Sequence, residues 1–217
     1  MAGCAAKYSG RRYHSDMNSP TFPRRDPAEA DFWDLRYEAC FAPWEARQAP
    51  ARLRDLASRP GIARKVLVPG CGSACDVAFL ARSGWDVLGI DFSRAALQAA
   101  QAELGSEAGR VRLADFFAPI PEAPFPVVYE RAFLCALPRR LWDDWGRRVA
   151  ELVPPGGLLA GFFYFDSGDR GPPFALHSQA ELDALLAPAF ERIEDAPVED
   201  SIPVFAGKER WQVWRRR

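Results

Sequence analysis

Residues 66–93, VLVPGCGSACDVAFLARSGWDVLGIDFS, constrain the fold of this chain more than any other stretch. A short apolar run leads into a turn with two glycines, then a helical pattern, a second apolar run and an acid. Apolar runs separated by a helix indicate parallel strands that are buried on both faces. Ligands of such sheets bind beyond the carboxyl ends of the strands. The stretch therefore predicts an α/β domain that binds a dinucleotide, a nucleotide or a nucleoside.

The same alternation continues to the end of the chain. Strands are predicted over residues 65–69, 86–91, 111–115, 126–131 and 158–166, and helices over residues 74–84, 93–105, 139–157 and 178–190. Upstream, Asp26 is a candidate N-cap for a helix over residues 26–40, and residues 42–61 have the pattern of a second helix. Two closing strands, 191–198 and 209–216, flank a turn and predict a hairpin. We expect an α/β fold: a mainly parallel seven-stranded sheet with an antiparallel C-terminal hairpin and helices on both faces.

Length and local composition predict one domain behind a polar tail. The chain has 217 residues, which suits a single hydrophobic core. Residues 1–25 are polar, rich in arginine and poor in apolar periodicity, so we predict that they are disordered. An Arg-rich transit peptide is the alternative interpretation of that segment. Residues 26–217 are predicted to form the single domain.

Charge, hydropathy and cysteine usage narrow the possible partners. The net charge is −1, and no apolar run approaches the ~20 residues of a membrane helix, so we expect neither nucleic acid nor a membrane as partner. The five cysteines lack the spacing of a disulfide framework, and with only two histidines a metal cluster is not predicted. We expect a cytoplasmic protein, a small-molecule substrate and a monomer.

Candidate ligand-binding residues follow the predicted strands. Gly70 and Gly72 form the turn after the first strand and let the backbone approach a ligand. Asp91 follows the second strand, 21 residues after Gly70, a position that suits a carboxylate accepting the ribose hydroxyls. Asp115 and Phe116 follow the third strand, where an acid and a ring could hold an adenine. The turn lacks the third glycine of the dinucleotide fingerprint. Together with the closing hairpin, this favours the nucleoside S-adenosylmethionine (SAM) over NAD.

The motifs resemble those of the thiopurine S-methyltransferase family, which also includes thiol and halide methyltransferases. The resemblance rests on VLVPGCGSACDV, GWDVLGIDFS, YERAFLCAL, the N-terminal FWDLRYEACFAPWEA, the loop GPPFALHS and the C-terminal turn DSIPVFAGKE. It implies a Rossmann-like class I methyltransferase domain that uses SAM and releases S-adenosylhomocysteine (SAH). It also implies that an N-terminal helical lid, residues 27–60, covers the cofactor.

The resemblance also assigns roles to residues by position. It implies that the lid closes over SAM and that Arg131, at the end of the fourth strand, borders both cofactor and substrate. The cofactor-binding residues predicted in this way are Trp33, Tyr37, Trp44, Gly70, Gly72, Asp91, Phe92, Asp115, Phe116 and Arg131. The lid tryptophans could instead be anchors of a packed N-terminal segment.

The expected reaction is methyl transfer to sulfur by in-line displacement, with Arg131 as the positioning residue and no general base. Arg131 favours a small or aromatic thiol, including a thiopurine, because arginine keeps its charge near the nucleophile. The C-terminal SIP turn, residues 201–203, resembles the thiol/halide branch instead. Halide, sulfide and selenium or tellurium oxyanions therefore remain alternatives. More distant alternatives are a non-catalytic SAM-binding protein and an NAD(P)-linked oxidoreductase.

Overall fold

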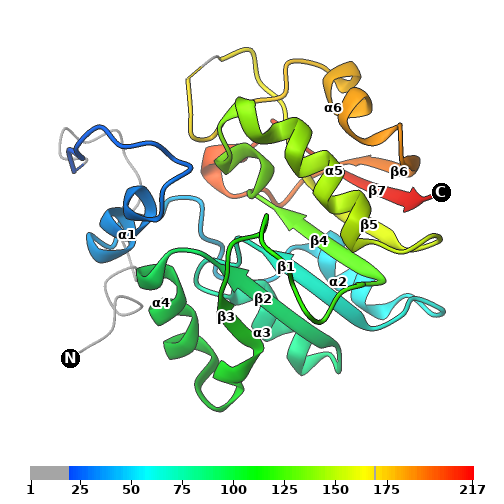
Figure 1. Ribbon diagram of the computed structural model, residues 1–217, viewed down its shortest axis with the longest axis horizontal. Helices are drawn as coiled ribbons and strands as arrows, with labels where there is room; N and C mark the ends of the chain where they lie inside the picture. The colour runs from blue at the N-terminus through cyan, green and yellow to red at the C-terminus, as the bar shows by residue number, and fades with distance from the viewer. Residues whose placement is uncertain (1–19, 169) are drawn as a thin grey trace.

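One seven-stranded sheet runs through the molecule in the order β3-β2-β1-β4-β5-β7-β6 (Figure 1). The computed structural model describes residues 20–168 and 170–217. Neighbouring strands are parallel except around β7, which is antiparallel to both β5 and β6. The strands are β1 (Lys65–Pro69), β2 (Asp86–Asp91), β3 (Val111–Leu113), β4 (Val127–Arg131), β5 (Leu158–Tyr164), β6 (Phe190–Pro197) and β7 (Glu209–Arg216). The predicted fold class and its C-terminal hairpin are confirmed.

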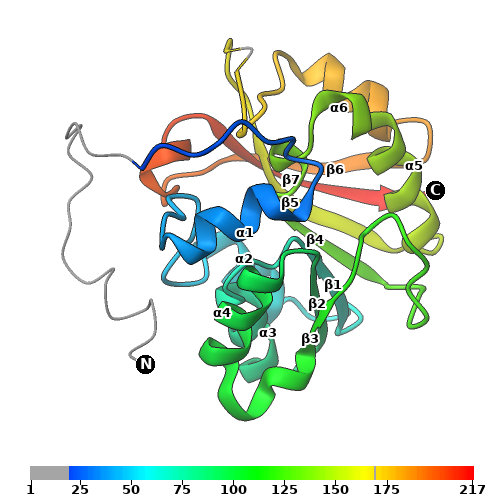
Figure 2. The ribbon, with the colours of Figure 1, turned by 60° about the vertical axis from the view of Figure 1, so that its left-hand side comes forward.

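Helices cover both faces of the sheet (Figure 2). The α-helices are α1 (Ala30–Glu38), α2 (Ala51–Ser58), α3 (Cys75–Arg82), α4 (Arg94–Leu104), α5 (Trp142–Leu152) and α6 (Gln179–Leu186). The short 3-10 helices are η2 (Gly105–Arg110), η3 (Leu134–Ala136), η4 (Arg139–Leu141) and η5 (Pro203–Phe205). Leu53 of α2 and Val77 of α3 belong to one core cluster, and Trp145 of α5 and Leu182 of α6 to the other. Each sheet face therefore has its own apolar core.

Local sequence signals explain where several helices begin. Ser93 caps α4, its hydroxyl accepting a hydrogen bond from the amide of Ala96 at 3.0 Å. Ser178 caps α6 in the same way, with the amide of Glu181 as donor at 3.4 Å. Both serines satisfy amides that have no partner inside the helix. The predicted starts of these two helices are therefore confirmed.

Two predicted N-terminal helices differ from the structure. The first begins at Ala30 rather than at residue 26, and the Asp26 carboxylate instead accepts the amide of Ala28 in the preceding turn at 3.0 Å. The second, α2, begins at Ala51, so residues 42–50 are not helical. Pro50 explains this start, because a proline lacks the amide that a helix interior needs and is tolerated in the first turn.

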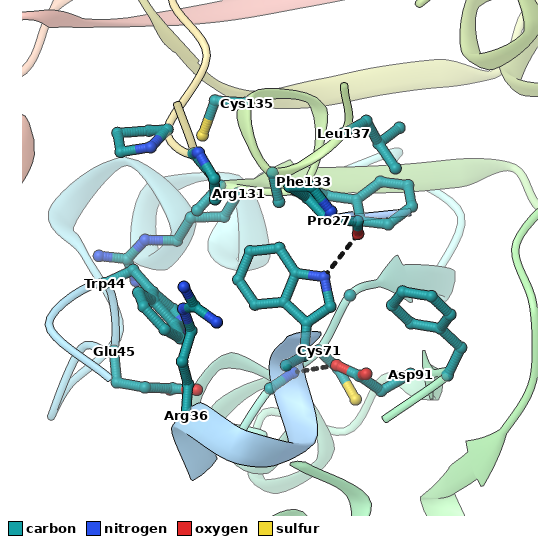
Figure 3. Close-up of a pocket in the computed structure, with 18 of the residues that line it drawn as sticks. Pro27, Arg36, Trp44, Glu45, Cys71, Asp91, Arg131, Phe133, Cys135 and Leu137 are labelled. Atoms are coloured by element: carbon teal, nitrogen blue, oxygen red, sulfur yellow. Dashed lines mark hydrogen bonds between the residues drawn. The ribbon is translucent and has the colours of Figure 1, made fainter. Parts of the chain in front are cut away.

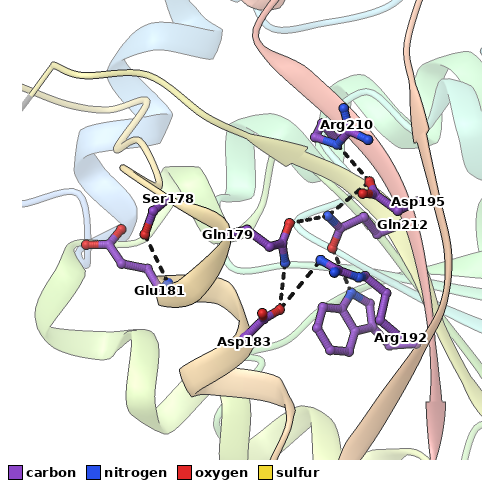
Figure 4. A network of polar contacts seen from close by, with 9 residues as sticks. Ser178, Gln179, Glu181, Asp183, Arg192, Asp195, Arg210 and Gln212 are labelled. Atoms are coloured by element: carbon purple, nitrogen blue, oxygen red, sulfur yellow. Dashed lines mark hydrogen bonds and ion pairs between the residues drawn. The ribbon is translucent and has the colours of Figure 1, made fainter.

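A buried polar network fixes the C-terminal hairpin against α6 (Figure 4). Gln212 of β7 is fully buried, and its side-chain amide donates to Gln179 of α6 at 2.6 Å and to Asp195 of β6 at 3.3 Å. Its oxygen accepts the indole N–H of Trp214 at 3.1 Å. These bonds satisfy both ends of the buried amide, which makes burial of Gln212 tolerable.

Helix α1 lies beside the carboxyl ends of the parallel strands (Figure 1). Asp34 attaches it to the body of the domain, since its carboxylate accepts the hydroxyl of Ser93 at 2.6 Å and the amide of Ala95 at 3.0 Å. An acid at the N-terminus of α4 is favoured by the helix dipole as well as by these donors. The N-terminal segment is thereby positioned over the edge of the sheet where a ligand is expected.

Candidate active site

A cavity of about 650 Å³ opens at the carboxyl ends of β1, β2 and β4, beneath α1 (Figure 3). Its volume is typical of small-molecule sites. Every residue predicted to contact the cofactor lines it: Trp33, Tyr37, Trp44, Gly70, Gly72, Asp91, Phe92, Asp115, Phe116 and Arg131. Of the predicted lid, residues from 27 to 46 reach the cavity and none of α2 does. The roles of these residues toward a ligand, and the division into tail, lid and domain, stay predictions. Residues 1–19 lie outside the described part of the chain.

Asp91, the last residue of β2, offers two acceptor oxygens to the cavity. One oxygen accepts the amide of Gly72 at 3.1 Å and the other accepts the amide of Ser93 at 2.9 Å. Each carboxylate oxygen has a second lone pair, so both can still accept a hydroxyl. Burial raises the pKa of Asp91 to about 6. This donor and acceptor set fits a ribose diol.

The turn after β1 requires its glycines. Gly70 and Gly72 have φ angles of +57° and +53°, a region that side chains disfavour. A Cβ on Gly70 would lie 2.5 Å from the ring of Phe133, and a Cβ on Gly72 would lie 2.6 Å from the Tyr37 hydroxyl and overlap the Glu45 carboxylate. The turn is therefore packed directly against the lid.

The end of β3 supplies the aromatic and acidic groups predicted for an adenine site. Asp115 lines the cavity, and one of its oxygens accepts the amide of Phe117 at 2.9 Å. Phe116 is buried, with its ring centroid 5.0 Å from that of Phe133. The second oxygen of Asp115 has no hydrogen-bond donor among the described residues. An acceptor beside a fixed ring suits an amino-substituted base.

The lid is joined to the glycine turn by Glu45, a residue that sequence reasoning missed. Its carboxylate accepts the Tyr37 hydroxyl, the amide of Ser73 at 2.9 Å and the hydroxyl of Ser73 at 2.5 Å. Trp44 donates its indole N–H to the Tyr37 oxygen at 3.3 Å and packs edge-on against Trp33, with centroids 5.4 Å apart. Burial raises the pKa of Glu45. The only sequence signal was its position directly after Trp44.

Arg131 is held by an acid that was also missed. Its guanidinium bonds to both oxygens of Asp76, at 3.2 and 3.1 Å, and the Tyr129 hydroxyl donates to the same carboxylate at 3.2 Å. Asp76 lies in the first turn of α3, directly behind the glycine turn. The ion pair is largely buried, so it fixes the direction in which Arg131 faces the cavity.

Loops late in the chain contribute apolar residues to the cavity lining. Pro172, Pro173, Val204 and Phe205 line the cavity, as does Cys135. These residues belong to the GPPFALHS loop and the SIPVFAGKE turn, which the sequence identified only through family resemblance. Among the described cysteines, Cys71, Cys75 and Cys135 are free thiols.

The sequence model of the thiopurine S-methyltransferase family matches residues 28–217, nearly all of the described chain. The chain belongs to the thiopurine S-methyltransferase family. It is therefore a methyltransferase that depends on SAM, as the sequence predicted. Membership also removes the support for the oxidoreductase and non-catalytic alternatives.

Curated relatives from plants and bacteria carry related names. A probable thiol methyltransferase 2 of Arabidopsis thaliana is 28% identical, covering 85% of this chain and 84% of its own. Thiocyanate methyltransferase 1 of Brassica oleracea is 28% identical over 88% of this chain and 87% of its own. A thiopurine S-methyltransferase of Pseudomonas putida strain GB-1 is 32% identical over 82% of this chain and 92% of its own. The chain is thus similar both to relatives named thiol or thiocyanate methyltransferases and to relatives named thiopurine S-methyltransferases.

Solved structures confirm the fold. The 1,6-didemethyltoxoflavin-N1-methyltransferase of Burkholderia thailandensis superposes with a TM-score of 0.69 at 18% identity, covering 94% of this chain and 98% of its own. The [4+2]-cyclase SpnF superposes with a TM-score of 0.63 at 19% identity, covering 91% of this chain and 99% of its own. Because proteins named for such different reactions share this fold, the acceptor must be argued from the site.

Other kinds of site find no support in the described residues. No group of three or more His, Cys, Asp and Glu side chains there is arranged to hold a metal ion. Within residues 20–168 and 170–217, no helix has the length and apolar character needed to cross a bilayer.

The fit of SAM to Asp91 predicts a pH dependence of binding. The ribose hydroxyls donate to the ionised carboxylate, so SAH affinity should rise as the pH increases through the Asp91 pKa of about 6 and level off near pH 7. Calorimetric titration across this range measures the effect, and Asp91→Asn should flatten it. The stability of the ligand-free protein should change with pH in the opposite direction. Its folded state keeps the proton at a higher pH than the unfolded chain, so this contribution to stability falls as pH rises from about 4 to 6. An SAH affinity that is constant from pH 5 to 7 would contradict the role of Asp91.

Proposed function

We propose that this enzyme methylates the sulfur of a small or aromatic thiol. The observation that supports the proposal is the composition of the acceptor end of the cavity. Arg131 lines the same cavity as proline, valine and phenylalanine side chains, and of the described residues that line the cavity none is a histidine. The nearby Asp76 is already bonded to Arg131 and Tyr129. Such a site suits a nucleophile that needs no general base.

A thiolate meets that requirement. Its proton passes to water before binding, and the permanent charge of Arg131 favours the ionised sulfur. When bound, SAM supplies the methyl group: the thiolate sulfur bonds to the methyl carbon while the electron pair of the broken bond stays on the departing thioether sulfur. The residues of the chain contribute placement and exclusion of water, which can lower such a barrier by up to ~7–11 kcal/mol.

Each part of the cavity has a distinct task in this proposal. Asp91, Asp115 and Phe116 hold the nucleoside. Gly70 and Gly72 give the methionine arm space to pass along the backbone. Trp33, Trp44 and Tyr37 would cover it and exclude water, and Arg131 lines the same cavity. The fixed Asp76–Arg131 pair then orients the acceptor sulfur in line with the methyl group.

A small inorganic anion is the second candidate acceptor. Two relatives are named thiocyanate methyltransferases, and residues 201–203 belong to the turn that resembles the thiol/halide branch. Thiocyanate, sulfide and iodide would also be attracted by Arg131. The apolar volume near Phe205 favours a larger organic thiol, since a small anion would leave those walls without contacts.

The decisive experiment is a turnover assay with SAM and a panel of acceptors. Thiophenol, a thiopurine, sulfide, thiocyanate, iodide and selenite would be compared at equal concentrations by the appearance of SAH. We expect the highest kcat/KM with an aromatic thiol. Equal or faster turnover of thiocyanate or iodide would replace the proposal by the second candidate, and no turnover of any thiol would overturn it.

A further inference from the structure

Arg36 of the lid is a second cation on the wall of the cavity. Its guanidinium carbon lies 3.4 Å from the ring centroid of Phe32 and 4.6 Å from that of Phe22. One of its terminal nitrogens donates to the carbonyl oxygen of Phe32 at 2.6 Å. Two aromatic rings and one hydrogen bond therefore hold the group in place on the cavity wall.

The charge of Arg36 is not balanced by an acid of the residues that the structure describes. Among the described residues, no carboxylate oxygen lies within ion-pair distance of its guanidinium, and its remaining N–H groups have no acceptor. Burial lowers the pKa of Arg36, yet arginine keeps its proton at physiological pH. A partly buried guanidinium with several unused donors is a receptor for an anion.

Four acids line the cavity, and none of them, Asp115 included, forms an ion pair with Arg36. Glu45 bonds to Tyr37 and Ser73, and Asp76 bonds to Arg131. Asp91 lies on the opposite side of the cavity from Arg36 and Trp44 (Figure 3). The described part of the chain therefore leaves Arg36 able to bind an anionic group of a ligand, away from the residue predicted to hold the ribose.

We propose that Arg36 binds an anionic substituent of the acceptor, so that the enzyme prefers thiols carrying a carboxylate, such as mercaptobenzoates. This inference rests on the proposed thiol methylation and names its substrate class. Arg36 would hold the carboxylate while Arg131 faces the sulfur, and the apolar walls would take the ring. Two cations on different elements, α1 and β4, then fix both ends of the acceptor.

The test compares acceptors that differ only in the carboxylate. For wild type, kcat/KM for 3-mercaptobenzoate should exceed that for thiophenol. Arg36→Gln should lower kcat/KM for 3-mercaptobenzoate by about 10- to 100-fold and change that for thiophenol less than about twofold, as expected for one hydrogen-bonded charge pair. Arg47→Gln is the matched control, because Arg47 is an exposed lid arginine that does not line the cavity.

Binding measurements separate this inference from the proposed function. The product analogue 3-(methylthio)benzoate should bind the wild-type SAH complex more tightly than the Arg36→Gln complex, while SAH affinity stays the same in both. Equal losses for both thiols, or a parallel loss of SAH affinity, would assign Arg36 to the cofactor and overturn the inference. If wild type methylates thiophenol but shows no preference for 3-mercaptobenzoate, only this inference fails. If it methylates no thiol, the proposed function fails, and the binding of the analogue still decides the role of Arg36.

Discussion

Replacing Asp91 by alanine should raise the Kd for SAH about 30- to 150-fold. The carboxylate is predicted to accept both ribose hydroxyls, and charge-assisted hydrogen bonds of this kind contribute about 2–3 kcal/mol together. The structure places both oxygens at the cavity, each with one backbone donor and a free lone pair. Isothermal calorimetry with SAH measures the change directly. Turnover at low SAM should fall by a similar factor.

A matched control for this variant lies on the same strand. Asp86 is the first residue of β2, so it lies at the other end of the strand from Asp91, and it is exposed. Asp86→Ala should therefore leave SAH affinity unchanged. Asp91→Ala also removes the acceptor of two amides, so its melting temperature must be recorded. Asp91→Asn keeps the shape and one acceptor and should still weaken binding at neutral pH. Wild-type SAH affinity in both folded variants would show that another group holds the ribose.

The parallel half of the fold could be predicted in detail because its signals are local. The strands that carry Gly70 and Asp91 are continuous apolar runs, and Ser93 caps the following helix within the same stretch. A strand-end acid must lie at the carboxyl edge of a parallel sheet, whatever the rest of the chain does. For that reason the predicted residues from separate strands, Asp91 and Asp115 among them, line one cavity.

The contacts between the lid and the sheet could not be predicted in this way. Glu45 meets Ser73, and Asp34 meets Ser93, across long separations in sequence, and no periodic pattern marks such pairs. Pro50 marked the true start of α2, but the apolar spacing upstream suggested a longer helix. Tertiary contacts with the glycine turn hold the segment around Trp44 in an irregular conformation instead. The family resemblance supplied the aromatic lid residues, not their acidic partner.

The residues proposed to select the acceptor were the hardest part of the site to predict from the sequence. Arg131 was identifiable at a strand end, but its fixed direction depends on Asp76 of another element. From the sequence, Arg36 is an ordinary arginine of a short helix. The structure places it on the cavity wall, with no acid of the described residues paired with it. The proposed specificity therefore depends on the Asp76–Arg131 pair and on the absence of an acid partner for Arg36 among the described residues, and both become visible only in the folded chain.

Replacing Trp44 by alanine should weaken SAH binding and lower kcat/KM together, each by about 30-fold or more. Trp44 packs against Trp33 and Tyr37, and its indole N–H donates to the Tyr37 oxygen. The Tyr37 hydroxyl in turn donates to the Glu45 carboxylate. Removing a large aromatic anchor from such a cluster costs about 2–3 kcal/mol. Calorimetry and initial rates measure the two effects. Trp44→Phe is the matched control, since it keeps one aromatic ring and loses the rest of the indole with its long hydrogen bond, and its losses should be smaller than those of Trp44→Ala.

Hydrogen exchange then shows whether Trp44→Ala loses SAH affinity and activity because its lid no longer closes. Methyl transfer gains from exclusion of water only if the cover closes after the ligand has entered. SAH should therefore slow amide exchange over residues 30–46 in wild type and in Trp44→Phe, but not in Trp44→Ala. Exchange over residues 179–186 of α6, none of which lines the cavity, serves as an internal reference. If residues 30–46 are equally protected with and without SAH in wild type, closure fails as an explanation. Trp44 would then be a packing anchor of a preformed site, because the Glu45 contacts alone would hold the segment on the glycine turn.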